Sequence, residues 1–101
     1  MAGPTFAGGN ILYFAAADQE ITGKYRIRGV AWTSNQGSDL DIAADDDMLL
    51  EDGSGDVVIG KRAESAEDGL TMSFPGDGII VNGLKAEDLD GGVLFVYVDK
   101  L

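Results

Sequence analysis

The side chains in this sequence that are capable of chemistry are almost all carboxylates. The chain has 101 residues, with 18 aspartates and glutamates, 7 lysines and arginines, and neither histidine nor cysteine. The missing residue types exclude a His-based catalytic triad, a disulfide and a Cys/His zinc site. Hydrolysis by paired carboxylates needs two of them held across a cleft, and no such pair stands out. We therefore expect no enzymatic activity, no catalytic residue and no cofactor.

Clustered carboxylates also suit a hard cation such as calcium. Asp52, Ser54 and Asp56 resemble the start of an EF-hand loop, but the required glycine and glutamate are replaced by Val57 and Ala63. The competing interpretation, a hairpin turn with a solvated acidic rim, is favoured, so we expect no metal. The weak calcium candidates that remain are Asp39, Asp41, Asp45 and Asp47.

Charge is distributed unevenly along the chain. The net charge is −11, yet residues 1–36 carry +1 and residues 37–101 carry −12. Nucleic-acid backbones and anionic membranes would repel so acidic a chain, and we therefore expect neither as a partner. Lys24, Arg26 and Arg28 share one face of a predicted strand. They either pair with the protein's own aspartates or form a docking stripe for an acidic patch on a partner or a neighbouring protomer.

Strands must position these side chains, because no window shows the spacing of an amphipathic helix. The alternation over residues 20–33 changes parity at Gly29, which predicts a bulge or a crossing between sheets. The fold class is all-β, a single antiparallel β-sandwich or jelly-roll-like domain of about eight short strands. The predicted strands cover residues 11–17, 20–33, 40–44, 48–51, 57–59, 70–74, 79–81 and 93–98.

The two ends of the chain carry further signals. Residues 1–10 are rich in glycine around a single Phe6, which predicts a flexible N-terminal arm in front of a β-sandwich domain at 11–101. Phe6 would anchor this arm on a partner, unless the arm is simply a frayed terminus. The strand at 93–98 is apolar on both parities, so we expect both of its faces to be covered. The cover is a loop, the arm, another subunit, or the protein's own segment 11–14.

Four segments in order carry a family resemblance. They are Tyr25–Trp32, Leu50–Val58, Ile80–Leu84 and Asp90–Val98. This order resembles the small β-sandwich virion proteins of tailed bacteriophages, of the capsid decoration (cement) type, over residues 11–99. The resemblance implies a protein that attaches to the outside of an icosahedral head, often as a trimer at local threefold positions, and clamps neighbouring major capsid subunits.

The first hypothesis is therefore a structural virion protein that stabilises a phage capsid by cross-linking its major capsid protein. It predicts a homo-oligomer, with a trimer favoured, on the outer capsid surface of a particle assembled in the host cytoplasm. We expect neither a signal peptide nor a membrane-spanning segment, because the sequence shows no apolar run of the required length. The partner-binding candidates are Phe6, Lys24, Arg26 and Arg28.

The alternative is a receptor- or glycan-binding module, such as a head-fibre or tail-associated adhesin domain. It predicts an exposed Trp32 or a tyrosine cluster in a groove. Trp32 shares its parity with Val30, so the pattern favours a core position for the only tryptophan, and burial of Trp32 would argue against this alternative.

Overall fold

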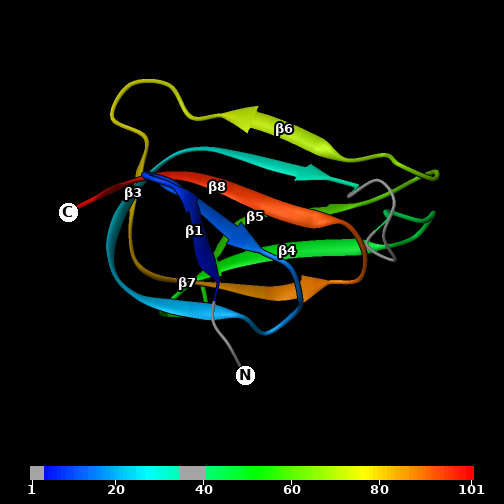
Figure 1. Ribbon diagram of the computed structural model, residues 1–101, viewed down its shortest axis with the longest axis horizontal. Coiled ribbons are helices and arrows are strands. Elements are labelled where there is room, and N and C mark those ends of the chain that lie inside the picture. The colour runs from blue at the N-terminus through cyan, green and yellow to red at the C-terminus, as the bar shows by residue number, and fades with distance from the viewer. Residues whose placement is uncertain (1–3, 35–40) are drawn as a thin grey trace.

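All regular structure in the computed structural model, which describes residues 4–34 and 41–101, is β-strand (Figure 1). The described residues contain no helix with the length and apolar character needed to cross a membrane. The strands are β1 (Thr5–Gly8), β2 (Ile11–Phe14), β3 (Glu20–Thr33), β4 (Asp47–Asp52), β5 (Val57–Arg62), β6 (Leu70–Ser73), β7 (Ile79–Leu89) and β8 (Val93–Lys100).

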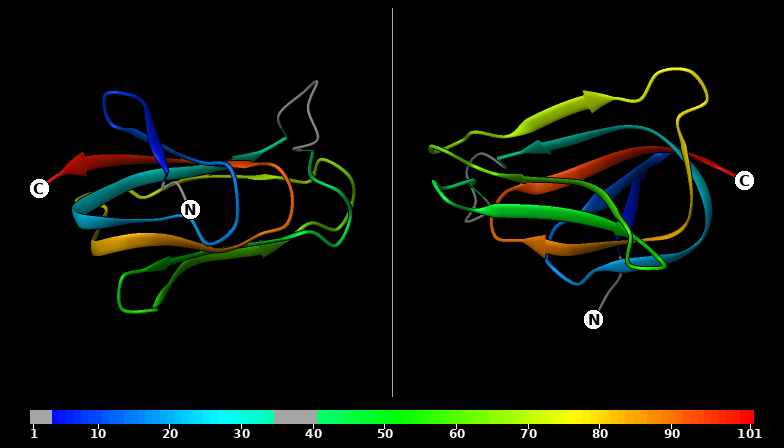
Figure 2. Two further views of the ribbon diagram at one scale, coloured as in Figure 1. Left: turned by 60° about the horizontal axis from the view of Figure 1, so that its bottom comes forward. Right: turned by 180° about the vertical axis from the view of Figure 1, so that it is seen from behind.

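The long strand β3 belongs to two layers at once. The strands form one antiparallel sheet in the order β1-β2-β8-β3-β7-β4-β5, and β6 pairs with β3 outside this path. The first part of β3, up to Ile27, pairs with β7, and the part from Gly29 to Trp32 pairs with β6. The sheet therefore folds over itself into two packed layers joined by β3 (Figure 2). The predicted fold class, an all-β antiparallel sandwich, is confirmed.

Gly29 marks the point where β3 changes partner. The register between β3 and β8 shifts between Ile27 and Gly29, so Arg28 is the extra residue of a bulge. A side chain at Gly29 would begin only 3.0 Å from the backbone oxygen of Met72 on β6. A larger residue would push β6 away by a few tenths of an ångström, so glycine suits this position, and the register shift confirms the bulge predicted from the parity change.

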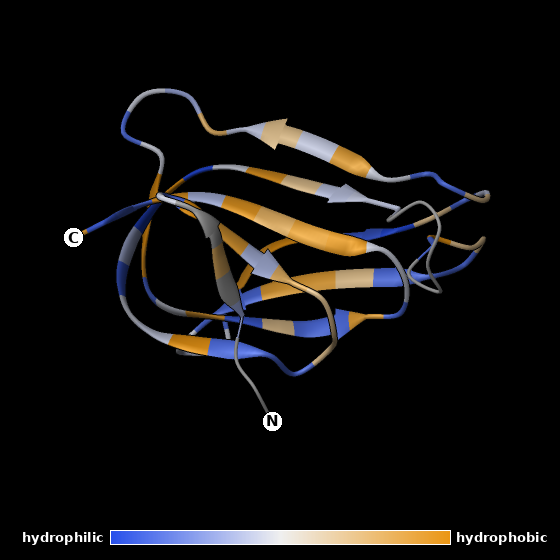
Figure 3. Ribbon diagram, viewed as in Figure 1, coloured by the Kyte–Doolittle hydropathy of each residue, from blue (hydrophilic) through white to orange (hydrophobic). Residues whose placement is uncertain are grey.

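The core lies between the two layers and is built from alternate residues of each strand. Trp32 is only 1 % exposed, and its indole Nε1 donates a hydrogen bond of 2.9 Å to the backbone oxygen of Gly91. No described residue buries a charged or polar side chain in this core. The core role expected of Trp32 is therefore confirmed. Figure 3 shows hydrophobic residues running almost unbroken along β8.

Two predicted strands differ most from the structure, and the ends of β2, β4, β5, β6 and β8 differ by one to three residues. β7 extends to Leu89, far beyond the expected segment 79–81, because Gly83 and a register shift opposite Leu49 change the parity of its buried residues twice. Because of these changes, buried and exposed residues do not alternate regularly along β7, and the sequence pattern does not predict its full length. Residues 41–44, predicted as part of a strand, form no strand, and residue 40 lies outside the described residues.

Residues 5–8, expected to belong to a flexible arm, form β1 and pair with β2. Phe6 lies opposite Leu12, is half-buried and packs against the core. The ammonium of Lys100 lies 4.0 Å from the centre of the Phe6 ring, a cation–π contact. Burial of this single aromatic side chain explains why a glycine-rich segment joins the sheet.

The hairpin predicted at Asp52-Gly53 is confirmed as the β4–β5 turn. The Asp52 carboxylate accepts hydrogen bonds from the backbone N–H groups of Ser54 at 2.8 Å and Asp56 at 3.0 Å. The N–H of Gly53 donates to the backbone oxygen of Asn82 on β7 at 3.0 Å. The turn is thereby fixed both to itself and to the neighbouring strand.

Replacing Gly53 with alanine should loosen this attachment. The new Cβ would overlap the backbone oxygen of Asn82, so the hairpin must shift, at a cost of about 1–3 kcal/mol in the free energy of unfolding. Urea unfolding of Gly53→Ala measures the loss, and Ser54→Ala, at an exposed position in the same turn, serves as the control. Equal stability of Gly53→Ala and the wild-type protein would contradict the role given to this contact.

Candidate functional site

Three aromatic side chains line the outer face of β2 and β8, and we call Tyr13, Phe95 and Tyr97 the aromatic strip. Tyr13 lies opposite Phe95 in the β2–β8 register, with ring centres 5.2 Å apart and ring planes at 45°. Tyr97 lies opposite Gly29 on β3, where a Cβ would stand 3.6 Å from its ring. The ring of Tyr97 therefore lies over the glycine at the bulge, and it is 40 % exposed.

The aromatic strip arises because β8 carries apolar residues on both of its faces. Leu94, Val96 and Val98 point into the core and are buried, so Phe95 and Tyr97 face outward. β2 lies beside β8 in the same layer and does not cover it. The expectation that both faces of the last strand are covered thus holds for the inner face, whereas the outer face stays partly open to solvent.

An ion pair adjoins the strip on the same face. Asp99, two residues after Tyr97, accepts a hydrogen bond of 2.8 Å from Nε of Arg28. Arg28 also donates through Nη1 to the backbone oxygen of Gly76 at 3.0 Å. For Arg28, pairing with one of the protein's own aspartates, the first of the two interpretations of the basic strand, is confirmed.

The other two cations of the basic strand have no such partner among the described residues. Lys24 lies opposite Asn82 and is exposed. Arg26 lies opposite Ile80 on one side and Asp99 on the other, and its Nε is buried without a hydrogen bond. Ile80 is 51 % exposed. The structure thus brings Arg26 and Arg28 together around Asp99, whereas Lys24 lines a cleft and Phe6 packs against the protein's own core.

A polar cleft of about 680 Å³ opens on the other layer, between the start of β3, β7 and the β4–β5 turn. Glu20, Lys85 and Glu51 form one cross-strand row along it. The pKa of Lys85 is raised, chiefly by its 3.0 Å contact with Glu87, so this amine stays charged. No aromatic side chain lines the cleft, and of its two lysines, Lys24 and Lys85, Lys85 is held in the form that is neither a base nor a nucleophile.

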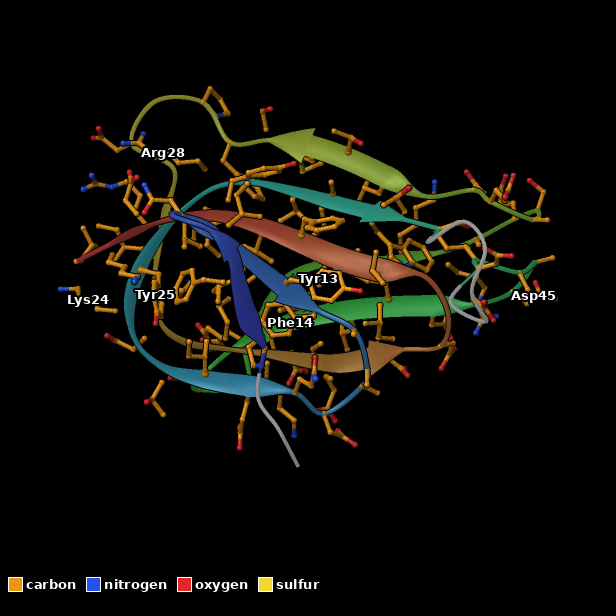
Figure 4. The ribbon with its side chains drawn as sticks, viewed as in Figure 1. Tyr13, Phe14, Lys24, Tyr25, Arg28 and Asp45 are labelled. Carbon is orange, nitrogen blue, oxygen red and sulfur yellow. The ribbon has the colours of Figure 1, made fainter. Side chains whose placement is uncertain are left out.

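Asp45 lies at the opposite end of the molecule from Lys24, as Figure 4 shows, whereas Glu51 and Asp52 line the cleft together with Lys24. Asp47 binds Arg62 through both carboxylate oxygens, at 2.9 and 3.1 Å, which lowers the pKa of Asp47. No group of three or more Asp or Glu side chains in residues 4–34 and 41–101 is arranged to hold a metal ion. Of the calcium candidates, Asp41, Asp45 and Asp47 fall within that search, and Asp39 lies outside the described residues.

No family model matches the chain, and no curated protein matches it. A solved structure similar to it is the fucose binding module SpX-3 of Streptococcus pneumoniae. The sequence identity is 11 % and the TM-score 0.46, over 89 % of this chain and 73 % of that chain. A likeness this low has no weight for function, which must be inferred from the surfaces of the molecule itself.

The sequence missed the aromatic strip as a site. The sequence contained a signal for it, because the strand at 93–98 carries apolar residues on both faces and aromatic residues on one of them. Such a face must either be covered or be available to a ligand. What the sequence lacked was the pairing of β2 with β8, which places Tyr13 beside Phe95 at the sheet surface.

An ion pair also fixes the segment that connects the two layers between β5 and β6. Lys61 donates hydrogen bonds of 3.0 Å to the Asp68 carboxylate and to the backbone oxygen of Gly69. The other carboxylate oxygen of Asp68 accepts a bond of 2.9 Å from the backbone N–H of Glu64. The Glu64 bond first, and Lys61 second, lower the pKa of Asp68.

This lowered pKa predicts a pH-dependent contribution to stability. The contribution of Asp68 is complete above the ordinary value of 3.8 and is lost as the pH falls through the lower folded-state pKa. Asp68→Asn should therefore be less stable than the wild-type protein at a pH of about 7, and the difference should shrink towards a pH of about 3. Urea unfolding across this range measures it, with Asp77→Asn, in an exposed loop, as the control. A difference that stays constant with pH would contradict the assignment.

Proposed function

We propose that the chain is a non-catalytic glycan-binding module that holds sugar rings on the aromatic strip. The observation that carries the proposal is the exposed ring of Tyr97 beside the Arg28–Asp99 ion pair. A sugar presents C–H groups on its ring faces and hydroxyl groups at its edge. One surface that joins an aromatic face to charged hydrogen-bonding groups matches both parts of such a ligand.

Support beneath the strip makes it a prepared surface. Tyr97 rests on Gly29, and Tyr13 and Phe95 contact each other in a tilted pair. A tyrosine has only two side-chain torsions, so little conformational entropy is lost when a ligand orders it. The buried Trp32 cannot serve as a platform, and burial of Trp32 counted against glycan binding at the outset. The tyrosine cluster, the other feature expected of a glycan-binding module, supplies the platform in its place, on an open sheet face and outside any groove.

Truncation of the central ring should abolish most of the binding. Tyr97→Ala removes the stacking surface, and a loss of about 1–2 kcal/mol corresponds to a roughly 5- to 30-fold weaker affinity. A glycan array finds the ligand of the wild-type protein, and calorimetry measures both proteins against it.

Met72→Ala is the matched control, because Met72 is exposed to a similar degree but lies on β6, outside the strip. The control should bind as the wild-type protein does. Failure of the wild-type protein to bind any glycan, or equal affinity of Tyr97→Ala, would rule out the proposal.

A second candidate, the phage capsid decoration protein, is favoured by a different surface. Ile79 and Ile80 at the start of β7 and Leu101, which follows β8, are exposed apolar side chains. Lys24 lies on the strand that pairs with β7, and the backbone N–H of Leu101 bonds to the oxygen of Lys24. An apolar patch with cations at its rim suits docking on an acidic protein surface such as a capsid subunit.

The test of this candidate mixes the purified protein with phage heads that lack a decoration protein. Decoration predicts binding and a higher melting temperature of the heads, because a partner that binds only the assembled state stabilises it. Ile80→Asp should abolish both effects, whereas Met72→Asp should abolish neither. Heads that are neither bound nor stabilised by the wild-type protein would exclude decoration.

A further inference from the structure

Two cations of this acidic chain have no partner among residues 4–34 and 41–101, although the chain carries 18 carboxylate side chains. Arg28, Lys61, Arg62 and Lys85 form ion pairs, and Lys100 lies over the Phe6 ring. Within the part of the chain that the structure describes, the side chains of Lys24 and Arg26 make no ion pair and no hydrogen bond to the protein. Cations left unpaired amid such an excess of carboxylates point to an anion supplied from outside.

The side chain of Arg26 lies on the same outer face as the aromatic strip, whereas Lys24 lines the polar cleft. Arg26 is opposite Asp99, and Asp99 follows Tyr97 by two residues on β8. Two residues of a strand span about 7 Å and neighbouring strands lie about 5 Å apart, so a ligand of two sugar units reaches from Tyr97 to Arg26. The Arg28–Asp99 ion pair lies beside them and leaves Arg26 as the unpaired cation on this face.

The state of Arg26 itself indicates a missing ligand. Its Nε is buried and has no hydrogen-bond partner. A buried donor without an acceptor is destabilising, and rotation of the guanidinium towards an outside anion would relieve it. A guanidinium donates two parallel hydrogen bonds to a carboxylate or a sulfate, which makes Arg26 suited to such a group.

We infer that the glycan held on the aromatic strip is acidic, with a carboxylate or sulfate group bound by Arg26 while a sugar ring stacks on Tyr97. This inference rests on the proposed function and names its ligand class. Asp99 holds Arg28 in place beside the ring, and Arg26 supplies the fork that recognises the anion. The charge of the ligand is opposite to that of this patch, although it has the same sign as the chain as a whole.

The test begins with an array that contains neutral, uronate-bearing and sulfated glycans. The inference predicts binding to members of the acidic classes, and the two acidic classes separate a carboxylate from a sulfate ligand. Binding that falls as the salt concentration rises is also expected, because the contacts are exposed to solvent. Preferential binding of neutral glycans would overturn the inference and leave the proposed function standing, whereas no binding of any glycan would overturn both.

Variants then locate the anion. Arg26→Gln should weaken binding of the best acidic glycan about 10-fold and leave binding of its carboxyl-reduced or desulfated counterpart unchanged. Arg62→Gln, which removes one cation on β5, is the matched control and should bind both glycans as the wild-type protein does. An equal loss for both glycans in Arg26→Gln, or no loss for either, would overturn the inference. Tyr97→Ala should weaken both, which separates stacking from recognition of charge.

Discussion

The structure depends on one constraint, that a single strand must serve both layers of the sandwich. β3 can do this only by changing partner from β7 to β6 within a few residues, and the bulge at Arg28 and Gly29 is where it changes. Because Gly29 has no side chain, both the backbone of β6 and the ring of Tyr97 can pack close to it. The same bulge turns Trp32 into the core and Arg28 outward to Asp99. Fold and candidate site therefore share one origin.

Electrostatics gives this surface its distinct character. Most cations of the chain are used internally, where they hold acidic loops and strand ends together, as in the pairs Arg62–Asp47 and Lys61–Asp68. The basic strand is different, since only Arg28 is paired there. Because Arg26 and Arg28 lie beside the single carboxylate of Asp99, this part of the strand forms a local positive region on a protein whose net charge is −11. Such local fields select and orient ligands more than they add affinity.

The sequence predicted the parts of the fold that depend on local patterns. The alternation in β3, the parity change at Gly29, the Asp52 turn and the burial of Trp32 all follow from period-two spacing and turn chemistry. The predicted β7 ended too early because the buried positions of this strand change parity twice. The sequence did not predict β1 because glycines surround the one residue, Phe6, that packs inward. The aromatic strip required long-range pairing of β2 with β8, which no local pattern specifies.

The most direct test of the central claim, that the outer face around Tyr97 is the binding surface, is an NMR titration of the labelled protein with a glycan selected on the array. The account predicts chemical-shift changes centred on Tyr97, Gly29, Arg26 and Asp99, with the polar cleft unaffected. Changes centred instead on Glu20, Glu51 and the β4–β5 turn would place the ligand in the cleft and contradict it.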